Sequence, residues 1–163
     1  MTKLRAVLVL AIAATAVSVV VLTAQAKTVD CSDADPSQTQ DYAPAGCKKS
    51  GDGFVINGTS RNDNLNGSDG DDKMNGGKGN DKMNGNAGDD SMKGGPGKDT
   101  MNGGSGRDKM GGGAGNDKVN GGSGNDNINV QGGGADKVNC GAGKDKVNAD
   151  SKDTVASNCE SVK

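Results

Sequence analysis

The nonapeptide Gly76-Gly77-Lys78-Gly79-Asn80-Asp81-Lys82-Met83-Asn84 is the cleanest copy of a unit that recurs through most of this chain. Each copy has a glycine-rich run, then an Asp, then an apolar residue two positions further on. The Asp recurs every nine residues from Asp63 to Asp126; the spacing slips by one residue before Asp136 and shortens before Asp153. Eleven near-copies of one unit predict a repeat architecture.

The unit can be written G-G-x-G-x-D-x-U-x, where U is apolar. Three glycines in four residues indicate turns, so we expect the first six positions to be neither strand nor helix. The last three positions predict a short strand. Its middle side chain points to one face, and the side chains before and after it point to the other. Two repeats would close one flattened coil, so equivalent positions of repeats i and i+2 would stack about 4.8 Å apart. The predicted fold is all-β, a parallel β-roll over residues 57–155.

The residue after each Asp favours two repeats per coil. If consecutive repeats stacked, three Lys–Lys neighbours would result, whereas alternate stacking brings together only Lys118 and Lys137. Like charges directly opposite each other on a sheet are unfavourable.

The composition lacks the material for an ordinary core. The 163 residues include one Phe, one Tyr, no Trp and 29 Gly, so some other agent must supply stability. The net charge is −2, or −4 without the N-terminal segment that holds Lys3 and Arg5. No basic patch is interleaved with aromatics, which argues against a nucleic-acid partner. The absence of His removes the commonest general base, so we do not expect an enzyme.

Stacked repeats would place the Asp carboxylates in two columns. Two carboxylates 4.8 Å apart repel by about 3.5 kcal/mol at an effective dielectric near 20, and several such pairs rival the stability of a whole domain. The columns therefore need cations between them. Carboxylate and carbonyl oxygens without a soft ligand select Ca²⁺, and metal binding would then be coupled to folding.

The array resembles the glycine-rich nonapeptide repeats of the repeats-in-toxin (RTX) family. The resemblance implies a right-handed parallel β-roll in which the sixth-position Asp and turn carbonyls of repeats i and i+2 share several Ca²⁺ ions, about six to eight in an array of this length. Carried onto this chain, the implied carboxylate ligands are Asp72, Asp81, Asp90, Asp99, Asp108, Asp117, Asp126, Asp136 and Asp145. The implied carbonyl ligands are Gly76, Gly79, Gly103, Gly106, Gly121 and Gly124. Asp63 and Asp153 lie in degraded repeats and are expected to be weak sites.

Toxins and proteases of that family carry a large effector domain, which we do not find in this sequence, so the resemblance supports neither pore formation nor proteolysis. The tail from Cys140 to Glu160 is similar to the ends of small exported bacterial calcium-binding proteins built on this repeat.

The N-terminus predicts export. Residues 1–5 carry Lys3 and Arg5, residues 6–24 are weakly apolar, and Ala24-Gln25-Ala26 is a small-x-small cleavage signature. Residues 1–26 therefore predict a signal peptide, with an uncleaved membrane anchor as the alternative because the apolar run is nearly long enough to span a bilayer. We expect a secreted, extracellular protein without a transmembrane domain after cleavage, or one held at the cell surface.

The four cysteines all lie in the exported part, which favours disulfides over a zinc site. Nested pairing, Cys31 with Cys47 and Cys140 with Cys159, is the most plausible of three connectivities because each pair brackets one end of the array, where a solenoid needs capping. Residues 27–56 form a polar segment, expected as a disulfide-closed loop on the first coil or as an unstructured leader. Residues 156–163 form the predicted C-terminal cap.

The five Met residues from Met74 to Met110 occupy the U position, which favours core filling over copper binding. Ninth-position Asn residues are expected to form side-chain ladders; these are Asn66, Asn75, Asn84, Asn102 and Asn120. The sequence predicts a calcium-binding β-roll that folds in extracellular Ca²⁺. The alternative is a structural or adhesive protein of the cell surface or matrix, in which Ca²⁺ is purely structural.

Overall fold

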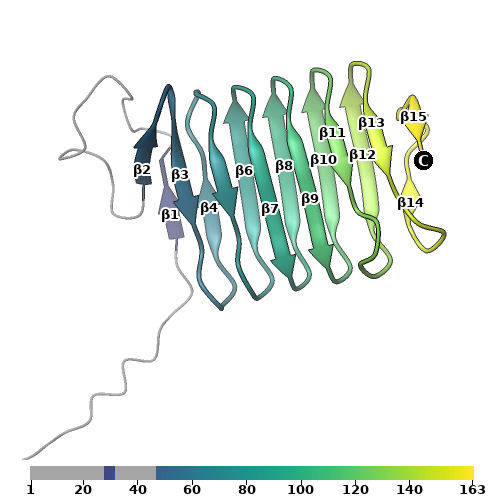
Figure 1. Cartoon of the computed structure of the whole chain (residues 1–163), viewed down its shortest axis with the longest axis horizontal. Coiled ribbons are helices and arrows are strands. Elements are labelled where there is room, and N and C mark those ends of the chain that lie inside the picture. Colours follow the sequence, from purple (N-terminus) through teal and green to yellow (C-terminus); the bar gives the residue numbers. More distant parts are fainter. Residues whose placement is uncertain (1–27, 32–46) are drawn as a thin grey trace, which may run out of the picture.

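The computed structural model describes residues 28–31 and 47–163, which form two parallel β-sheets stacked into a roll (Figure 1). The predicted signal peptide lies outside the described residues, as do residues 32–46. The strands are β1 (Thr28–Asp30), β2 (Cys47–Ser50), β3 (Gly53–Asn57), β4 (Asn64–Asn66), β5 (Lys73–Asn75), β6 (Lys82–Ala87), β7 (Ser91–Pro96), β8 (Thr100–Ser105), β9 (Lys109–Ala114), β10 (Lys118–Ser123), β11 (Asn127–Asn129), β12 (Lys137–Ala142), β13 (Lys146–Asn148), β14 (Thr154–Val155) and β15 (Ser161–Val162). None of the described residues forms a helix that could cross a membrane.

Successive repeats enter the two sheets alternately. Sheet A has seven strands in the order β1-β4-β6-β8-β10-β12-β14, and sheet B has eight in the order β15-β13-β11-β9-β7-β5-β3-β2. Apart from β2, which pairs antiparallel with β3, neighbouring strands are parallel and come from alternate repeats, as in the pairing of Met83 with Met101. The predictions of a parallel β-roll and of two repeats per coil are confirmed.

One inserted residue explains the slip in the repeat phase. Val119 pairs with Val138, nineteen positions further on instead of eighteen. The extra length is taken up in the turn after β11, where Gly132 has a φ of +84° and a Cβ would meet open space. The strand register is therefore kept while the turn alone changes.

Several strands are longer than the sequence predicted. β6 to β10 and β12 continue into the first three positions of the next repeat, and Gly104 pairs with Gly122 there. The expectation that these positions lie outside any strand was wrong for those repeats. Because the coils stack in register, the backbone N–H and C=O groups of the turn also find partners in the adjacent coil.

The U side chains fill the thin space between the sheets. All of them from Leu65 to Val147 are at most 3% exposed, and the five Met residues lie among them, as predicted. The roll also begins earlier than Asn57, because Val29 aligns with Leu65 and Ile56 aligns with Met74. These two residues serve as U positions for coils that have no glycine-rich loop before them.

Both predicted disulfides are present, one at each end of the roll. Cys31 bonds to Cys47, which joins the end of β1 to β2. Cys140 of β12 bonds to Cys159 in the last turn. Strand β2 pairs antiparallel with β3 and so covers the outer edge of sheet B.

The predicted Asn ladder is confirmed on sheet A. The side-chain amide of Asn102 donates to Asn84 at 2.8 Å, and that of Asn120 donates to Asn102 at 2.7 Å. The ladder continues to Asn139 and Asn158. Asn66 and Asn75 do not take part in it.

Candidate metal centre

The sixth-position Asp residues form two columns, one along each set of turns. The first column contains Asp63, Asp81, Asp99, Asp117 and Asp136, and the second contains Asp72, Asp90, Asp108, Asp126 and Asp145; each of these residues is at most 3% exposed. Each column lies where the chain enters a strand, because the strand begins at the next residue.

One oxygen of each carboxylate has a structural role. From Asp81 onward, the Oδ1 atom accepts a hydrogen bond from the backbone N–H of the Asp one coil earlier, as between Asp81 N–H and Asp99 Oδ1 at 2.8 Å. The same contact repeats along both columns at 2.6–2.9 Å; Oδ1 of Asp72 accepts instead from the N–H of Phe54 at 2.6 Å. Through Oδ1, the carboxylate therefore links adjacent turns directly, without a metal ion.

The other oxygen is unpartnered in most repeats. The Oδ2 atoms of eight residues are buried and have no hydrogen-bond donor among the described residues: Asp81, Asp90, Asp99, Asp108, Asp117, Asp126, Asp136 and Asp145. A buried acceptor without a donor costs about 1–3 kcal/mol, and more when it is charged. Eight such atoms in one small protein indicate that something else binds there.

Burial raises the pKa of several of these carboxyls. The pKa of Asp90 rises to about 8, chiefly because burial disfavours the charged form, while the backbone N–H of Asp72 opposes the rise and the charge of Asp108 adds to it. The pKa of Asp99 and that of Asp108 each rise to about 6 for the same reason. The columns are thus unstable as bare anions and favour a proton or a cation.

The first-position glycines show where a cation would lie. A Cβ added to Gly103 would collide with both Asp108 Oδ2 and the carbonyl oxygen of Gly121. The same pair of oxygens, one carboxylate and one carbonyl from the next coil, faces Gly76, Gly85, Gly94 and Gly121. The orphaned oxygens of Asp81, Asp90, Asp99, Asp108 and Asp126 therefore each share one glycine with a backbone oxygen of the next coil.

This oxygen-only donor set fits Ca²⁺. Among residues 28–31 and 47–163, no three His, Cys, Asp or Glu side chains converge as a metal-binding group, so an ion between the coils would need backbone oxygens to complete its shell. The carbonyls of Gly76, Gly103 and Gly121 lie beside the carboxylates. Those of Gly79, Gly106 and Gly124 lie instead against the fourth-position glycine of the following coil.

The first two loops differ from the others. Oδ2 of Asp63 accepts hydrogen bonds from the N–H and the hydroxyl of Thr59, at 2.5 and 2.8 Å. Oδ2 of Asp72 accepts from the N–H of Ser68 at 2.6 Å. The sequence grouped Asp72 with the strong ligands, but the geometry places it with Asp63, because a hydroxyl residue stands at the second position of both loops.

The C-terminal end of each column is closed by an acid. Asp136 N–H donates to Asp153 Oδ1 at 3.0 Å, and Asp153 Oδ2 accepts from the N–H of Asp150 at 2.7 Å. In the second column Asp145 N–H donates to Glu160 Oε2 at 2.8 Å. Sequence reasoning missed Glu160, although Val162 follows it at the U spacing.

One regular position is interrupted. A Cβ on Gly112 would meet Asp117 Oδ2 at 2.6 Å and Cγ1 of Val130 at 3.4 Å, with no carbonyl oxygen as close as these. Val130 stands where other repeats have the first glycine, and its side chain is buried. At Gly121 the carbonyl of Cys140 is kept, so the interruption is confined to the Asp117 position.

Fold and columns together define a parallel β-roll with oxygen-lined sites for divalent cations. Residues 57–92, 79–110 and 93–128 match the family described as RTX calcium-binding nonapeptide repeat (4 copies). Residues 57–128 therefore belong to the RTX family, whose repeats bind several Ca²⁺ ions. No curated protein and no solved structure matches the sequence.

Proposed function

We propose that this chain is a secreted, non-enzymatic calcium-binding β-roll that folds when Ca²⁺ occupies its Asp columns. The observation that carries the proposal is the set of eight buried Oδ2 atoms without a donor. Leaving them as bare anions would cost an amount comparable with the 5–15 kcal/mol of stability of an ordinary domain (about 1–3 kcal/mol each). Ca²⁺ bound between the coils would remove this cost only in the folded state, which couples binding to folding.

The proposed ligands are the eight Asp residues with unpartnered Oδ2 atoms and the first-position carbonyls next to them. Asp63, Asp72 and Asp153 are proposed as weak sites or as non-ligands, because protein donors already satisfy their second oxygen. When bound, Ca²⁺ would supply charge neutralisation and no reaction chemistry.

The disulfides support an extracellular location. Two bonds close the ends of the roll, and disulfides persist in oxidising compartments, where Ca²⁺ is also abundant. The N-terminal segment with Lys3 and Arg5 supports export as a signal peptide.

A calcium titration of the disulfide-bonded chain tests the proposal. Far-ultraviolet circular dichroism should change from a disordered spectrum in chelator to a β spectrum as Ca²⁺ reaches about 0.1–1 mM, and calorimetry should report several ions per chain. Mg²⁺ at the same concentration is the control, since it prefers a smaller octahedral site and keeps its waters. An unchanged β spectrum after complete removal of metal would overturn the coupling of folding to Ca²⁺.

A second candidate is a structural or adhesive role in which Ca²⁺ only holds the roll together. The observation in its favour is the regular polar outer face of both sheets, where Lys, Asn, Ser and Thr recur at each coil. The two candidates share the same calcium sites and differ in whether the folded roll also binds a macromolecule.

A further inference from the structure

The outer face of sheet B carries lysines that form no ion pair with the described residues. Lys73, Lys93, Lys109 and Lys146 project from β5, β7, β9 and β13 and are exposed. The other exposed residues of the sheet B strands from β5 to β13 are Ser, Asn or Gly, apart from Pro96 and Ala114 at the ends of β7 and β9. The one ion pair found among the described residues joins Arg107 to Asp89 in a turn, so no described carboxylate pairs with these lysines.

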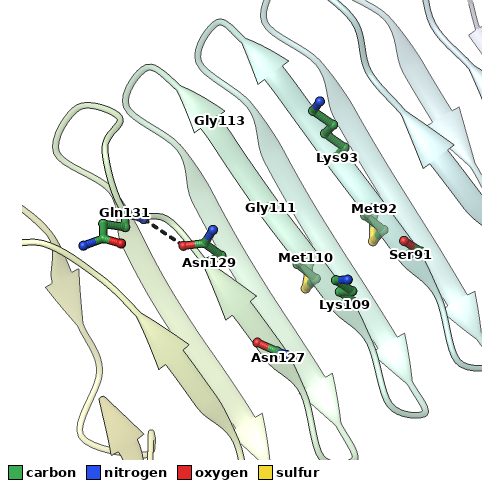
Figure 2. A pocket seen from close by; sticks show the side chains of 10 residues that line it. All are labelled: Ser91, Met92, Lys93, Lys109, Met110, Gly111, Gly113, Asn127, Asn129 and Gln131. Carbon is green, nitrogen blue, oxygen red and sulfur yellow. Dashed lines mark hydrogen bonds between the residues drawn. The ribbon is translucent and has the colours of Figure 1, made fainter. Parts of the chain in front are cut away.

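A shallow groove crosses this face (Figure 2). It has a volume of about 380 Å³ and is bordered by Lys93 and Lys109 on one side and by Asn129 and Gln131 on the other. Its floor includes Gly111, which stands at a ninth position where many repeats have Asn. A Cβ on Gly111 would meet nothing within 4 Å, so the missing side chain is what opens the groove.

The amide groups beside the groove are available to donate hydrogen bonds. On sheet A, each Asn of the ladder donates to the Asn one coil earlier, which uses their polar atoms along the stack. On sheet B, Lys93 and Gly111 break the ladder. There Asn148 donates to the side-chain oxygens of Asn129 and Gln131 at 3.1 and 3.0 Å. Within the described part of the chain, the NH₂ groups of Asn129 and Gln131 have no acceptor.

A second depression lies along the turns. It has a volume of about 570 Å³ and is lined by Lys109, Lys144 and Lys146 beside Asn125 and Asn127, and also by Asp89, Asp108 and Asp126; Arg107, which lines it too, is paired with Asp89. Lys109 and Asn127 also line the groove, so the two depressions are adjacent. The groove presents ammonium and amide donors, which suit a ligand with anionic and neutral acceptors, whereas the acids of the turn depression make it the poorer place for an anion.

Calcium binding would change the sign of the protein's charge. Without residues 1–26, whose only charged side chains are Lys3 and Arg5, the formal charge is −4. Two Ca²⁺ ions would neutralise the chain and a third would make it a net cation. The Asp columns are buried. Ca²⁺ bound to them would cancel the negative potential that opposes the positive potential of the lysine face.

We propose that the outer face of sheet B is a calcium-gated binding surface for an acidic polysaccharide. The groove would hold carboxylate or sulfate groups through Lys93 and Lys109 and hydroxyl groups through Asn129 and Gln131, and Lys146 would bind a further anionic group beyond it. A linear polymer fits because the donors repeat along the stack at multiples of about 4.8 Å. This inference rests on the proposed function, because the face exists only in the folded roll.

The chemistry of the face disfavours other polyanions. Nucleic-acid strands are held partly by stacking on aromatic side chains, and Phe54 is buried in the core. Binding in a membrane surface uses exposed apolar side chains. Among the described residues, Val162 near the C-terminal end is the one large apolar residue that is exposed, and it lies outside the groove.

The test measures binding of the disulfide-bonded chain to immobilised chondroitin sulfate in about 5 mM Ca²⁺ and in chelator. Binding is expected with Ca²⁺ and should be lost in chelator. The variant K93Q/K109Q/K146Q should bind about tenfold more weakly. The matched variant K82Q/K118Q/K137Q removes the same charge from sheet A and should change affinity by less than about threefold. Gly111→Asn, which fills the groove in open space, should also weaken binding.

Each result decides a separate part of the inference. Equal losses in the two triple variants would overturn the assignment to sheet B, and equal binding in chelator would overturn the gating. Equal or tighter binding of single-stranded DNA or of anionic phosphatidylserine vesicles would overturn the choice of a polysaccharide. Calcium-induced folding seen by circular dichroism without any binding would overturn this inference and leave the proposed function intact, whereas absence of folding would contradict the proposed function itself.

Discussion

The backbone N–H of Asp90 donates a 2.9 Å hydrogen bond to Oδ1 of Asp108, one coil further along the roll, while Oδ2 of Asp108 is buried without a donor. One carboxylate thus has a structural oxygen and a free oxygen. The first fixes the stacking of turns, and the second makes that stacking costly until a proton or a cation arrives.

Asp108→Asn should have opposite effects with and without metal. Asparagine can keep the Oδ1 acceptor while it removes a buried charge, so the metal-free chain should gain stability and the Ca²⁺ affinity should fall by about tenfold or more. Far-ultraviolet circular dichroism in chelator, which should show more β structure in the variant than in the parent chain, and calorimetric titration measure the two effects. Asp89→Asn removes the same charge at an exposed position one coil earlier, where it pairs with Arg107 only at the surface, and should change neither by more than a small amount. No gain of β structure in chelator would contradict the assignment of Oδ2 as the costly atom.

Asp117→Asn should lower Ca²⁺ affinity less than Asp108→Asn does. The Val130 methyl group near Gly112 stands where other coils present a carbonyl oxygen, so the Asp117 position already lacks a ligand that Asp108 has. Parallel calorimetric titrations of the two variants compare the losses. Equal losses would show that Val130 does not disturb the site.

Gly103→Ala should destabilise the calcium-loaded roll. Its methyl group would collide with Asp108 Oδ2 and Gly121 O, and overpacking of this kind costs about 1–3 kcal/mol. Gly111→Ala is the matched control, because it lies in the same strand-and-turn unit and its methyl would meet open space. That control should be neutral or stabilising by up to about 1 kcal/mol. Chemical denaturation in saturating Ca²⁺ gives both values. Equal destabilisation would argue that Asp108 Oδ2 and Gly121 O leave room for a methyl group at Gly103.

Acid should partly replace calcium. Because burial raises the pKa of Asp90 to about 8 and those of Asp99 and Asp108 to about 6, the folded metal-free roll binds protons more tightly than the unfolded chain. Its stability should therefore be greatest below pH 4 and be lost as the pH rises from about 4 to 8. Circular dichroism in chelator across this range should show β structure growing on acidification. Calcium affinity should move the other way, since the ion needs the charged carboxylates.

Removal of the C-terminal disulfide should loosen the last coil. Cys140 is buried in β12 and its partner Cys159 lies nineteen positions later, so C140S/C159S should cost about 3 kcal/mol of stability in Ca²⁺. Denaturant unfolding measures the loss. Hydrogen exchange should report faster opening of β14 and β15 than of β6 and β8, and uniform exchange along the roll would contradict a cap-specific role.

The sequence predicted the repeating part of the structure well because one periodic pattern controls several features at once. A U residue every nine positions sets the core, and the adjacent Asp and Gly set the turn. The phase also placed all eight residues that carry an unpartnered Oδ2. Alternate stacking followed from the Lys pattern, and the structure pairs Lys118 with Lys137 as expected.

The features that the sequence did not predict lie where the repeat pattern is absent or interrupted. Val29 and Ile56 do not follow a glycine-rich nonapeptide, so only their pairing with Leu65 and Met74 in the structure identifies them as core residues. Glu160 lies fifteen residues after Asp145 and replaces Asp by a longer acid. The effect of Ser68 on Asp72 and that of Val130 near Asp117 depend on single contacts between side chains and backbone, which a repeat pattern does not encode.

The antiparallel strand β2 over the edge of sheet B has a consequence for self-association. Stacked parallel strands with identical side chains in register are the arrangement found in amyloid, where an open edge recruits further chains. Here the strand direction reverses at one end, and at the other the ladder tapers to the two-residue strands β14 and β15. Copies of this protein should therefore stay separate at concentrations where an uncapped roll would polymerise into fibres.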